Sequence, residues 1–179
     1  MDFTSTEIVI TESRIKIPVA VVLQRTIDPS KKWSYPNWSI AAVVAGENIQ
    51  QQREKMTIHE TENTFRSFHG GLLLELFKDG SEGYWYNLLS DKPYLFVICE
   101  GEQGAMEVEP VFITANQDEA TGHLESDDIV LSVVMPGEIR DLLERYVVDH
   151  YQPAIKKKRK RRDWLDDSLY VNSESGNKQ

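Results

Sequence analysis

Cysteine is nearly absent from this sequence of 179 residues, which contains only Cys99. A single thiol excludes an internal disulfide framework and a metal centre built from several thiolates. The four histidines are scattered and form no His-x-x-x-His pair. Clustered His and Cys ligands are what a structural or catalytic zinc site requires. We therefore expect no metal and no other cofactor.

Long apolar runs are missing as well. The longest uncharged apolar runs, at 18–23 and 95–99, are far shorter than the roughly 20 residues that a helix needs to cross a bilayer. The first residues, Met-Asp-Phe-Thr, provide neither the basic nor the apolar region of a secretory signal. The expectation is a cytoplasmic protein without a transmembrane segment.

Motifs of nucleotide binding and nucleophilic catalysis do not occur. The sequence has no P-loop, no Gly-x-Gly-x-x-Gly and no Gly-x-Ser-x-Gly. Cys99 lies in a strongly apolar segment, where a thiol is normally a buried, unreactive hydrophobe. His69-Gly70-Gly71 is compatible with an anion-binding nest or with a β-bulge. Whether the protein is an enzyme stays open, and these absences favour a non-enzymatic role.

Charge is distributed very unevenly along the chain. The net charge is −9, yet one uninterrupted basic run near the C-terminus comprises Lys156, Lys157, Lys158, Arg159, Lys160, Arg161 and Arg162. The rest of the chain is therefore seven charges more acidic than the net value. Because an acidic surface repels phosphate, the charge of the folded part argues against nucleic-acid binding by that part.

The basic run has four interpretations. It is a solvated tail, a segment that docks on an acidic partner or on this protein's own acidic body, an anchor for an anionic membrane, or, least favoured, a nucleic-acid contact. Trp164 and Leu165 follow the run closely. An apolar anchor beside charge provides register as well as attraction, so we expect these nine residues to bind a protein partner.

The pattern along the chain predicts one domain with two tails. Residues 1–13 are mostly polar and are expected to form a flexible arm. Residues 14–152 are expected to form a single β-rich domain, and residues 153–179 a basic, largely disordered tail.

Apolar alternation and β-branched runs predict about seven or eight strands. They fall at 14–23, 39–45, 56–59, 72–77, 83–89, 94–99, 106–113 and 129–134. Asp79-Gly80 favours a tight turn, so we expect 72–77 and 83–89 to form a hairpin. Pro18 cannot donate to a ladder and is expected at a bulge or on an edge side.

Two helices are predicted. Asn116 followed by Glu119 fits a capping box and opens a short helix to about Leu124. Pro136 opens a second, amphipathic helix of about 15 residues with an apolar stripe of Ile139, Leu142, Leu143, Tyr146 and Val147.

The order of elements predicts a mainly β (α+β) fold. We expect a small antiparallel barrel or roll covered by the C-terminal amphipathic helix. The expected shared core comprises Leu72, Leu74, Leu76, Leu95, Val97, Leu142, Leu143 and Val147.

Aromatic residues are the remaining candidates for a binding surface. Trp33, Trp38, Tyr84 and Trp85 lie near expected loop ends, and aromatic side chains bring a large contact area at low entropic cost. The alternative is that they pack in the core and at its rim. We carry them forward as a possible partner-binding groove.

A set of dispersed segments resembles a bacterial family known only as a domain of unknown function. The segments are 17–25, Trp33 and Trp38 before Ala41-Val43-Val44, 71–76, Glu82-Gly83-Tyr84 with Asn87-Leu88, 93–97, Thr114-Ala115 with Glu119-Ala120, 134–136 and the basic run. The resemblance covers about residues 14–163. It implies a proteobacterial protein encoded beside molybdenum-dependent formate dehydrogenase genes, loosely labelled for molybdopterin guanine dinucleotide biosynthesis.

Two functions follow as expectations. The first is a non-enzymatic accessory or adaptor protein for maturation or assembly of a molybdenum-dependent formate dehydrogenase, with an enzyme subunit or maturation factor as the partner. The alternative is a small-ligand or nucleotide-handling enzyme of molybdenum cofactor biosynthesis. Its anion donors would be His69-Gly70-Gly71, Arg66 and Arg25. The resemblance supplies no catalytic residues for either function.

Overall fold

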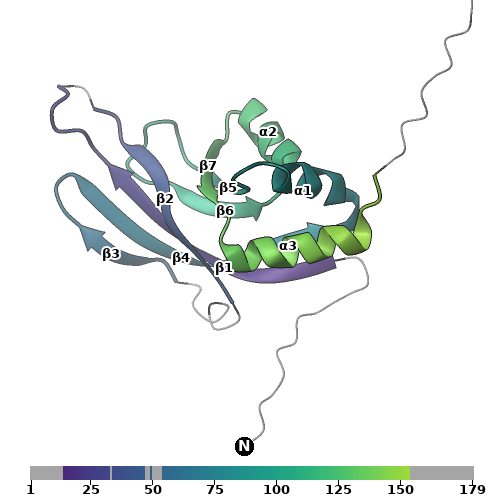
Figure 1. Cartoon of the computed structure of the whole chain (residues 1–179). Helices are drawn as coiled ribbons and strands as arrows, with labels where there is room; N and C mark the ends of the chain where they lie inside the picture. The colour runs from purple at the N-terminus through teal and green to yellow at the C-terminus, as the bar shows by residue number, and fades with distance from the viewer. Residues whose placement is uncertain (1–13, 33, 47–48, 50–53, 154–179) are drawn as a thin grey trace, which may run out of the picture.

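The computed structural model describes residues 14–32, 34–46, 49 and 54–153. Two antiparallel sheets and three α-helices make up this part of the chain (Figure 1). The strands are β1 (Arg14–Thr26), β2 (Asn37–Ala45), β3 (Met56–Glu60), β4 (Thr64–Phe77), β5 (Tyr94–Glu100), β6 (Glu109–Thr114) and β7 (Ile129–Val134). The helices are the short 3₁₀ turn η2 (Lys78–Gly80), α1 (Ser81–Leu88), α2 (Gln117–Glu125) and α3 (Gly137–His150).

The mainly β class is confirmed, but the described strands do not close into a barrel. One sheet has the order β2-β1-β4-β3 and the other the order β6-β5-β7. Strand β4 approaches β6 and β2 approaches β7, yet no ladder joins either pair. A period-2 pattern shows which residues face inward but not whether two sheet edges pair, which is why the barrel prediction was wrong.

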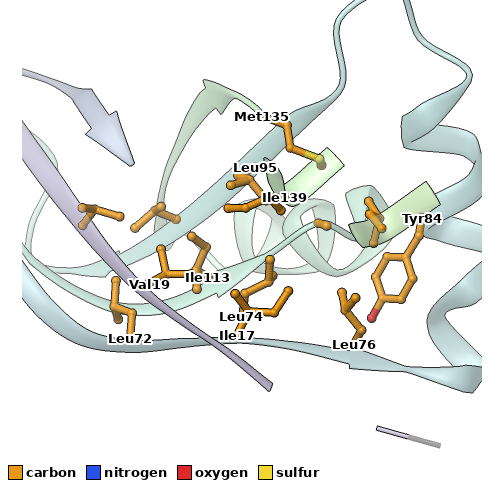
Figure 2. Close-up of a cluster of buried hydrophobic side chains, with 14 of the residues drawn as sticks. Ile17, Val19, Leu72, Leu74, Leu76, Tyr84, Leu95, Ile113, Met135 and Ile139 are labelled. Atoms are coloured by element: carbon orange, nitrogen blue, oxygen red, sulfur yellow. The ribbon is translucent and has the colours of Figure 1, made fainter. Parts of the chain in front are cut away.

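The hydrophobic core lies between the two sheets and α3 (Figure 2). Of the predicted core residues, all are buried except Leu142, which is partly buried against the same cluster. Strands β1 and β4 contribute alternate residues such as Ile17, Val19 and Leu74 to one wall. Helix α3 is held onto this wall by Tyr146, whose hydroxyl donates to the carbonyl of Leu76.

Residues 83–89 are not a return strand, so the predicted hairpin is wrong. Gly80 ends the 3₁₀ turn and is the N-cap of helix α1 with φ −81°, whereas the tight hairpin turn that Asp-Gly favours requires positive φ. The helix buries Gly83, Tyr84 and Asn87. The side-chain amide of Asn87 donates to the carbonyls of Tyr94 and Ala115 at 2.7 Å each. These long-range bonds stabilise a helix where the local aromatic composition favours a strand.

A β-bulge in strand β2 shifts which of its residues face the core. The sequence pattern predicts Ile40, Ala42 and Val44 on one face. In the structure Val22 pairs with Ala42 and Leu23 with Ile40, so Ala41 is the extra residue. The bulge shifts the alternation, and Ile40 shares the core face with Val43 and Ala45.

The predicted cap of α2 is confirmed at Asn116, but Glu119 does not make the reciprocal bond of a capping box. Asn116 caps α2 by accepting a hydrogen bond from the Asp118 amide. The Thr114 hydroxyl joins the two ends of the expected capping box, because it accepts from the Asn116 amide and donates to the Glu119 carboxylate. Pro18 lies one residue past the last β1–β2 pair, Val19 with Ala45, so its missing donor interrupts no β1–β2 pair. Strand β1 is paired on both sides, but the β1–β2 ladder ends beside Pro18 and the β1–β4 bulge begins at Val19, so this position agrees with the predicted bulge or edge side.

Parts of the predicted domain organisation lie outside the described residues. The arm 1–13 and, apart from Pro153, the tail 153–179 belong to these parts. Within the described part, one hydrophobic cluster contains residues of both sheets, α1, α2 and α3 or their flanks. None of its helices is long and apolar enough to span a lipid bilayer.

Candidate functional site

The predicted aromatic groove is not assembled by the described residues. Trp33 lies outside them. The Trp38 indole donates to the carbonyl of Ala105 at 3.0 Å, in the loop between β5 and β6. Trp85 packs instead on Tyr86 and Tyr151, with ring centroids 5.0 and 5.3 Å away. The two tryptophans therefore contact different parts of the fold.

Tyr84 belongs to the core rather than to a surface groove. Its side chain is 2% exposed, and its hydroxyl accepts a hydrogen bond from the Phe77 amide at 3.2 Å. Burial raises the pKa of Tyr84 to about 12. The hydroxyl thus satisfies the last backbone donor of β4 and links the start of α1 to the sheet.

The partner-binding segment predicted at the C-terminus lies outside the described residues. This concerns Lys156, Lys157, Lys158, Arg159, Lys160, Arg161, Arg162, Trp164 and Leu165. The prediction for these residues stands unchanged.

The anion donors named for the alternative enzyme do not converge. Arg66 points to the outer face of the four-stranded sheet and donates to Gln24 at 2.6 Å. Arg25 lies on the inner face, where it covers the rings of Phe65 and Trp38 and donates to the carbonyl of Met106. His69 is buried on that inner face as well. Alternation along β1 and β4 separates Arg66 from the other two.

The two glycines after His69 form a β-bulge. Val19 pairs with Leu72 and Val21 with His69, so two residues of β4 oppose one residue of β1. Gly71 has φ +82°, a conformation that favours glycine. The bulge allows β4 to direct Ser67 and His69 inward on one side of it and Leu72 and Leu74 on the other. The structure thus selects the bulge over the anion-binding nest.

A polar relay that sequence reasoning missed runs through the junction of β4 and β6. Ser67 Oγ lies 2.8 Å from His69 Nε2. On the other side of the ring, His69 Nδ1 lies 3.4 Å from Glu109 Oε1. Lys55 forms an ion pair with the same Glu109 carboxylate at 3.5 Å. The Ser67-x-His69 spacing could have revealed the first contact, because residues i and i+2 share a face of a strand. No local signal indicates Glu109.

This relay has the order of groups found in a serine nucleophile with its base, but it is closed to substrate. Ser67 is 1% exposed, and its strand β4 is paired with β1 on one side and with β3 on the other. A nucleophile needs room for a reacting carbonyl or phosphoryl group about 3 Å away. We interpret the relay as a polar contact that joins the two sheets.

Two titratable groups in this region have shifted pKa values. Burial lowers the pKa of His69, and the nearby Glu109 opposes that shift only in part. Burial, aided by Glu109, raises the pKa of the Cys99 thiol to about 12. Cys99 is thus the unreactive hydrophobe that the sequence predicts. Among the described residues, no group of three or more His, Cys, Asp or Glu side chains is placed to hold a metal ion.

Two surface hollows are open and lie away from the relay. One is lined by Thr26, Asp28, Lys31, Ser34, Tyr35 and Asn37. The other is lined by Arg14, Phe77, Lys78, Asp79 and His150. Neither contains a residue of the relay or Cys99.

The most extensive candidate site is the outer face of the four-stranded sheet. The helices and the second sheet lie on its other side (Figure 1). Ladder pairing places an apolar row of Ala42, Val22, Phe68 and Met56 across all four strands. Pro18 pairs with Leu73 on the same face, and Val44 pairs with the buried Ala20 between these rows. We call this set the outer band: Pro18, Val22, Ala42, Val44, Met56, Phe68 and Leu73.

The outer band is exposed although it is apolar. Met56 is 53% exposed, Val44 45% and Leu73 36%, while the other members are partly buried. Contiguous apolar area of this kind usually marks an interaction surface. Between Phe68 and Leu73 the two bulge glycines contribute no side chain, so another molecule can approach the backbone closely there.

Cations flank the outer band at both ends. At one end Lys16 pairs with Glu75 in the ladder and forms an ion pair with it at 3.0 Å, and Arg14 contacts the same carboxylate. At the other end Arg66 bonds the neutral Gln24. Burial alone would raise the pKa of Glu75. The hydrogen bonds from Arg14 and Lys16 outweigh this effect and hold the pKa of Glu75 below its ordinary value. Glu75 therefore stays ionised and is already neutralised by its own neighbours.

Comparison with known proteins shows the family of the chain. The model of the family DUF3305, described as a protein of unknown function, matches residues 18–161. No curated protein and no solved structure matches the chain. The matched region contains every residue of the outer band and of the relay. Because it spans most of the sequence, the chain belongs to the DUF3305 family.

Proposed function

We propose that this protein is a non-enzymatic accessory protein that binds another protein through the outer band. Its partner is a subunit of a molybdenum-dependent formate dehydrogenase or a factor that matures or assembles this enzyme. The exposed outer band is the observation that supports a binding role. The identity of the partner rests on the sequence resemblance described above.

The physical basis of the proposal is the free energy of apolar burial. Each Å² of apolar surface removed from water stabilises a complex by about 25 cal/mol. A band that crosses four strands offers a contiguous area, whereas isolated exposed apolar residues do not. The closed relay at Ser67 and the separated cations Arg25 and Arg66 give a catalytic alternative no comparable support.

An affinity purification tests this function. The full chain, tagged and expressed in its native host, is recovered with its bound proteins, which are identified by mass spectrometry. We expect a formate dehydrogenase subunit or maturation factor. A Met56→Thr, Leu73→Thr double variant places threonine, whose β-branched side chain suits a strand, at both positions, and it should lose this partner.

Val148→Thr provides the matched control, because Val148 is exposed on α3, away from the outer band. It should retain the partner. Recovery of no molybdoenzyme subunit or maturation factor with the wild-type chain contradicts the proposed function.

A further inference from the structure

We infer that the outer band accepts an acidic amphipathic helix of the partner protein. This inference rests on the proposed function, because it names the structural element and the charge of the partner that the outer band binds. Three features of the described residues support it: the paired backbone of the sheet, the sign of the flanking charges and the distance between them.

The paired backbone favours a helix as the occupant. The outer band lies mainly on β1, β2 and β4, and β1 and β4 are paired on both sides. Their backbone donors and acceptors are engaged in the ladders and are not available to a ligand lying on the face. An extended peptide lying there would bury its own backbone groups without partners, which costs free energy. A helix satisfies its backbone internally and presents an apolar stripe.

The flanking charges select an acidic helix. Lys16, Arg14 and Arg66 are the cations at outward ladder positions of β1 and β4, and Glu75 is the carboxylate there. Glu75 is already bound by Arg14 and Lys16. No ion pair links Arg66 to a carboxylate among the described residues. On a chain with a net charge of −9, this face is thus locally cationic, and opposite charge steers and orients a partner.

The distance between the cationic ends sets the length of the helix. Lys16 and Gln24, the ladder partner of Arg66, are eight residues apart on β1, which corresponds to about 27 Å at 3.4 Å per residue. A helix rises 1.5 Å per residue, so about 18 residues span the same distance. The partner helix should therefore carry carboxylates near both ends of a five-turn apolar stripe.

Other occupants fit these charges less well. A second copy docked face to face would bring the cations of one outer face against those of the other. The basic run 156–162 would meet like charge at the same positions. An anionic bilayer would attract the face, but it would repel the rest of this acidic chain. A helix supplies both carboxylates and an apolar stripe in one element.

Site-specific photo-crosslinking tests the inference on the full chain in its native host. A photoreactive phenylalanine analogue replaces Leu73 in one variant and Val44 in another, and Val148 in a matched control. Cross-linked peptides are then sequenced. We expect Leu73 and Val44 variants to capture one segment of a different protein, with apolar residues spaced i, i+3, i+4 and at least one carboxylate near each end. The Val148 variant should not capture it.

A charge variant provides a second, quantitative readout. Lys16→Gln with Arg66→Gln should weaken binding of the captured segment, made as a synthetic peptide, by roughly three- to tenfold at low salt and reduce its salt dependence. Lys92→Gln removes an exposed cation of the turn before β5 and should change neither value.

Several outcomes would overturn the inference. These are capture of a basic or non-helical segment, capture of a second copy of this chain or of lipid, no capture by either outer-band variant when both are folded, and equal peptide affinity of the charge variant and wild type. Such results leave the proposed function intact if the affinity purification still recovers a formate dehydrogenase partner. Conversely, an acidic helix captured from an unrelated protein contradicts the proposed partner and not the inference.

Discussion

His69 on β4 and Glu109 at the start of β6 face each other across the junction of the two sheets, with His69 Nδ1 3.4 Å from Glu109 Oε1. Ser67 contacts the opposite ring nitrogen at 2.8 Å, whereas Nδ1 makes no hydrogen bond among the described residues. This buried histidine links a sheet that carries the candidate binding face to the sheet that covers the core.

The lowered pKa of His69 predicts a pH dependence of stability. Because burial holds its pKa below the ordinary value in the folded state, the unfolded chain binds a proton first as the pH falls. The resulting stabilisation of the folded state is complete above about pH 6.5, the ordinary value. It decreases as the pH falls below that value, by at most about 1.4 kcal/mol per pH unit for one group.

Urea unfolding at pH 7.5 and pH 5.5 measures this effect. His69→Gln should show a smaller loss of unfolding free energy between the two pH values than wild type. His59→Gln, at an exposed position of β3, is the control and should behave as wild type. An identical loss in wild type and His69→Gln would remove His69 as the cause.

Alanine substitutions at two helical glycines, Gly83 on α1 and Gly122 on α2, should have opposite effects on the free energy of unfolding. A methyl group at Gly83 would overlap the side-chain oxygen of Asn116, which caps α2. We expect Gly83→Ala to destabilise the protein by about 1–2 kcal/mol, because the cap is displaced. Gly122 on α2 has open space around it, so Gly122→Ala should stabilise by about 0.5–1 kcal/mol. Chemical denaturation measures both, and a stabilising Gly83→Ala would contradict the packing of α1 on α2.

The burial of Leu143 predicts that packing of α3 on the sheets contributes strongly to stability. Its side chain is fully buried in the core cluster. Leu143→Ala should lower the unfolding free energy by about 2–5 kcal/mol. Val148→Ala, on the exposed side of the same helix, should change it by less than about 0.5 kcal/mol. Similar small losses for both variants, measured by urea denaturation, would show that α3 is not part of the cooperative core.

The basic run and its apolar neighbours predict two different kinetic effects on partner binding. Charge reversal at Arg159, Lys160 and Arg161 should slow association and weaken its salt dependence, because exposed charges mainly set the association rate. Trp164→Ala should instead speed dissociation, as the loss of a buried anchor does. Surface plasmon resonance with the identified partner separates the two rates. If truncation after Ile155 leaves both rates unchanged, the segment is a solvated tail.

Local sequence patterns determined much of the fold. The alternation of Ile15, Ile17 and Val19 continues through β1, and the apolar spacing of Ile139, Leu143 and Tyr146 forms the buried stripe of α3. Each of these patterns repeats within a few residues. Their burial follows from a periodicity that matches the geometry of a single strand or helix.

Only the tertiary structure decided the conformation of α1 and the places where the two sheets meet. Aromatic residues at 84–86 favour a strand locally, but the bonds of Asn87 to Tyr94 and Ala115 stabilise a helix. Likewise Ser67 and Glu109 are far apart in sequence, and pairing across β1 and β4 places Lys16 and Arg66 at opposite ends of one face. These relationships depend on strand register and sheet packing, which join distant residues and leave no periodic signal in the chain.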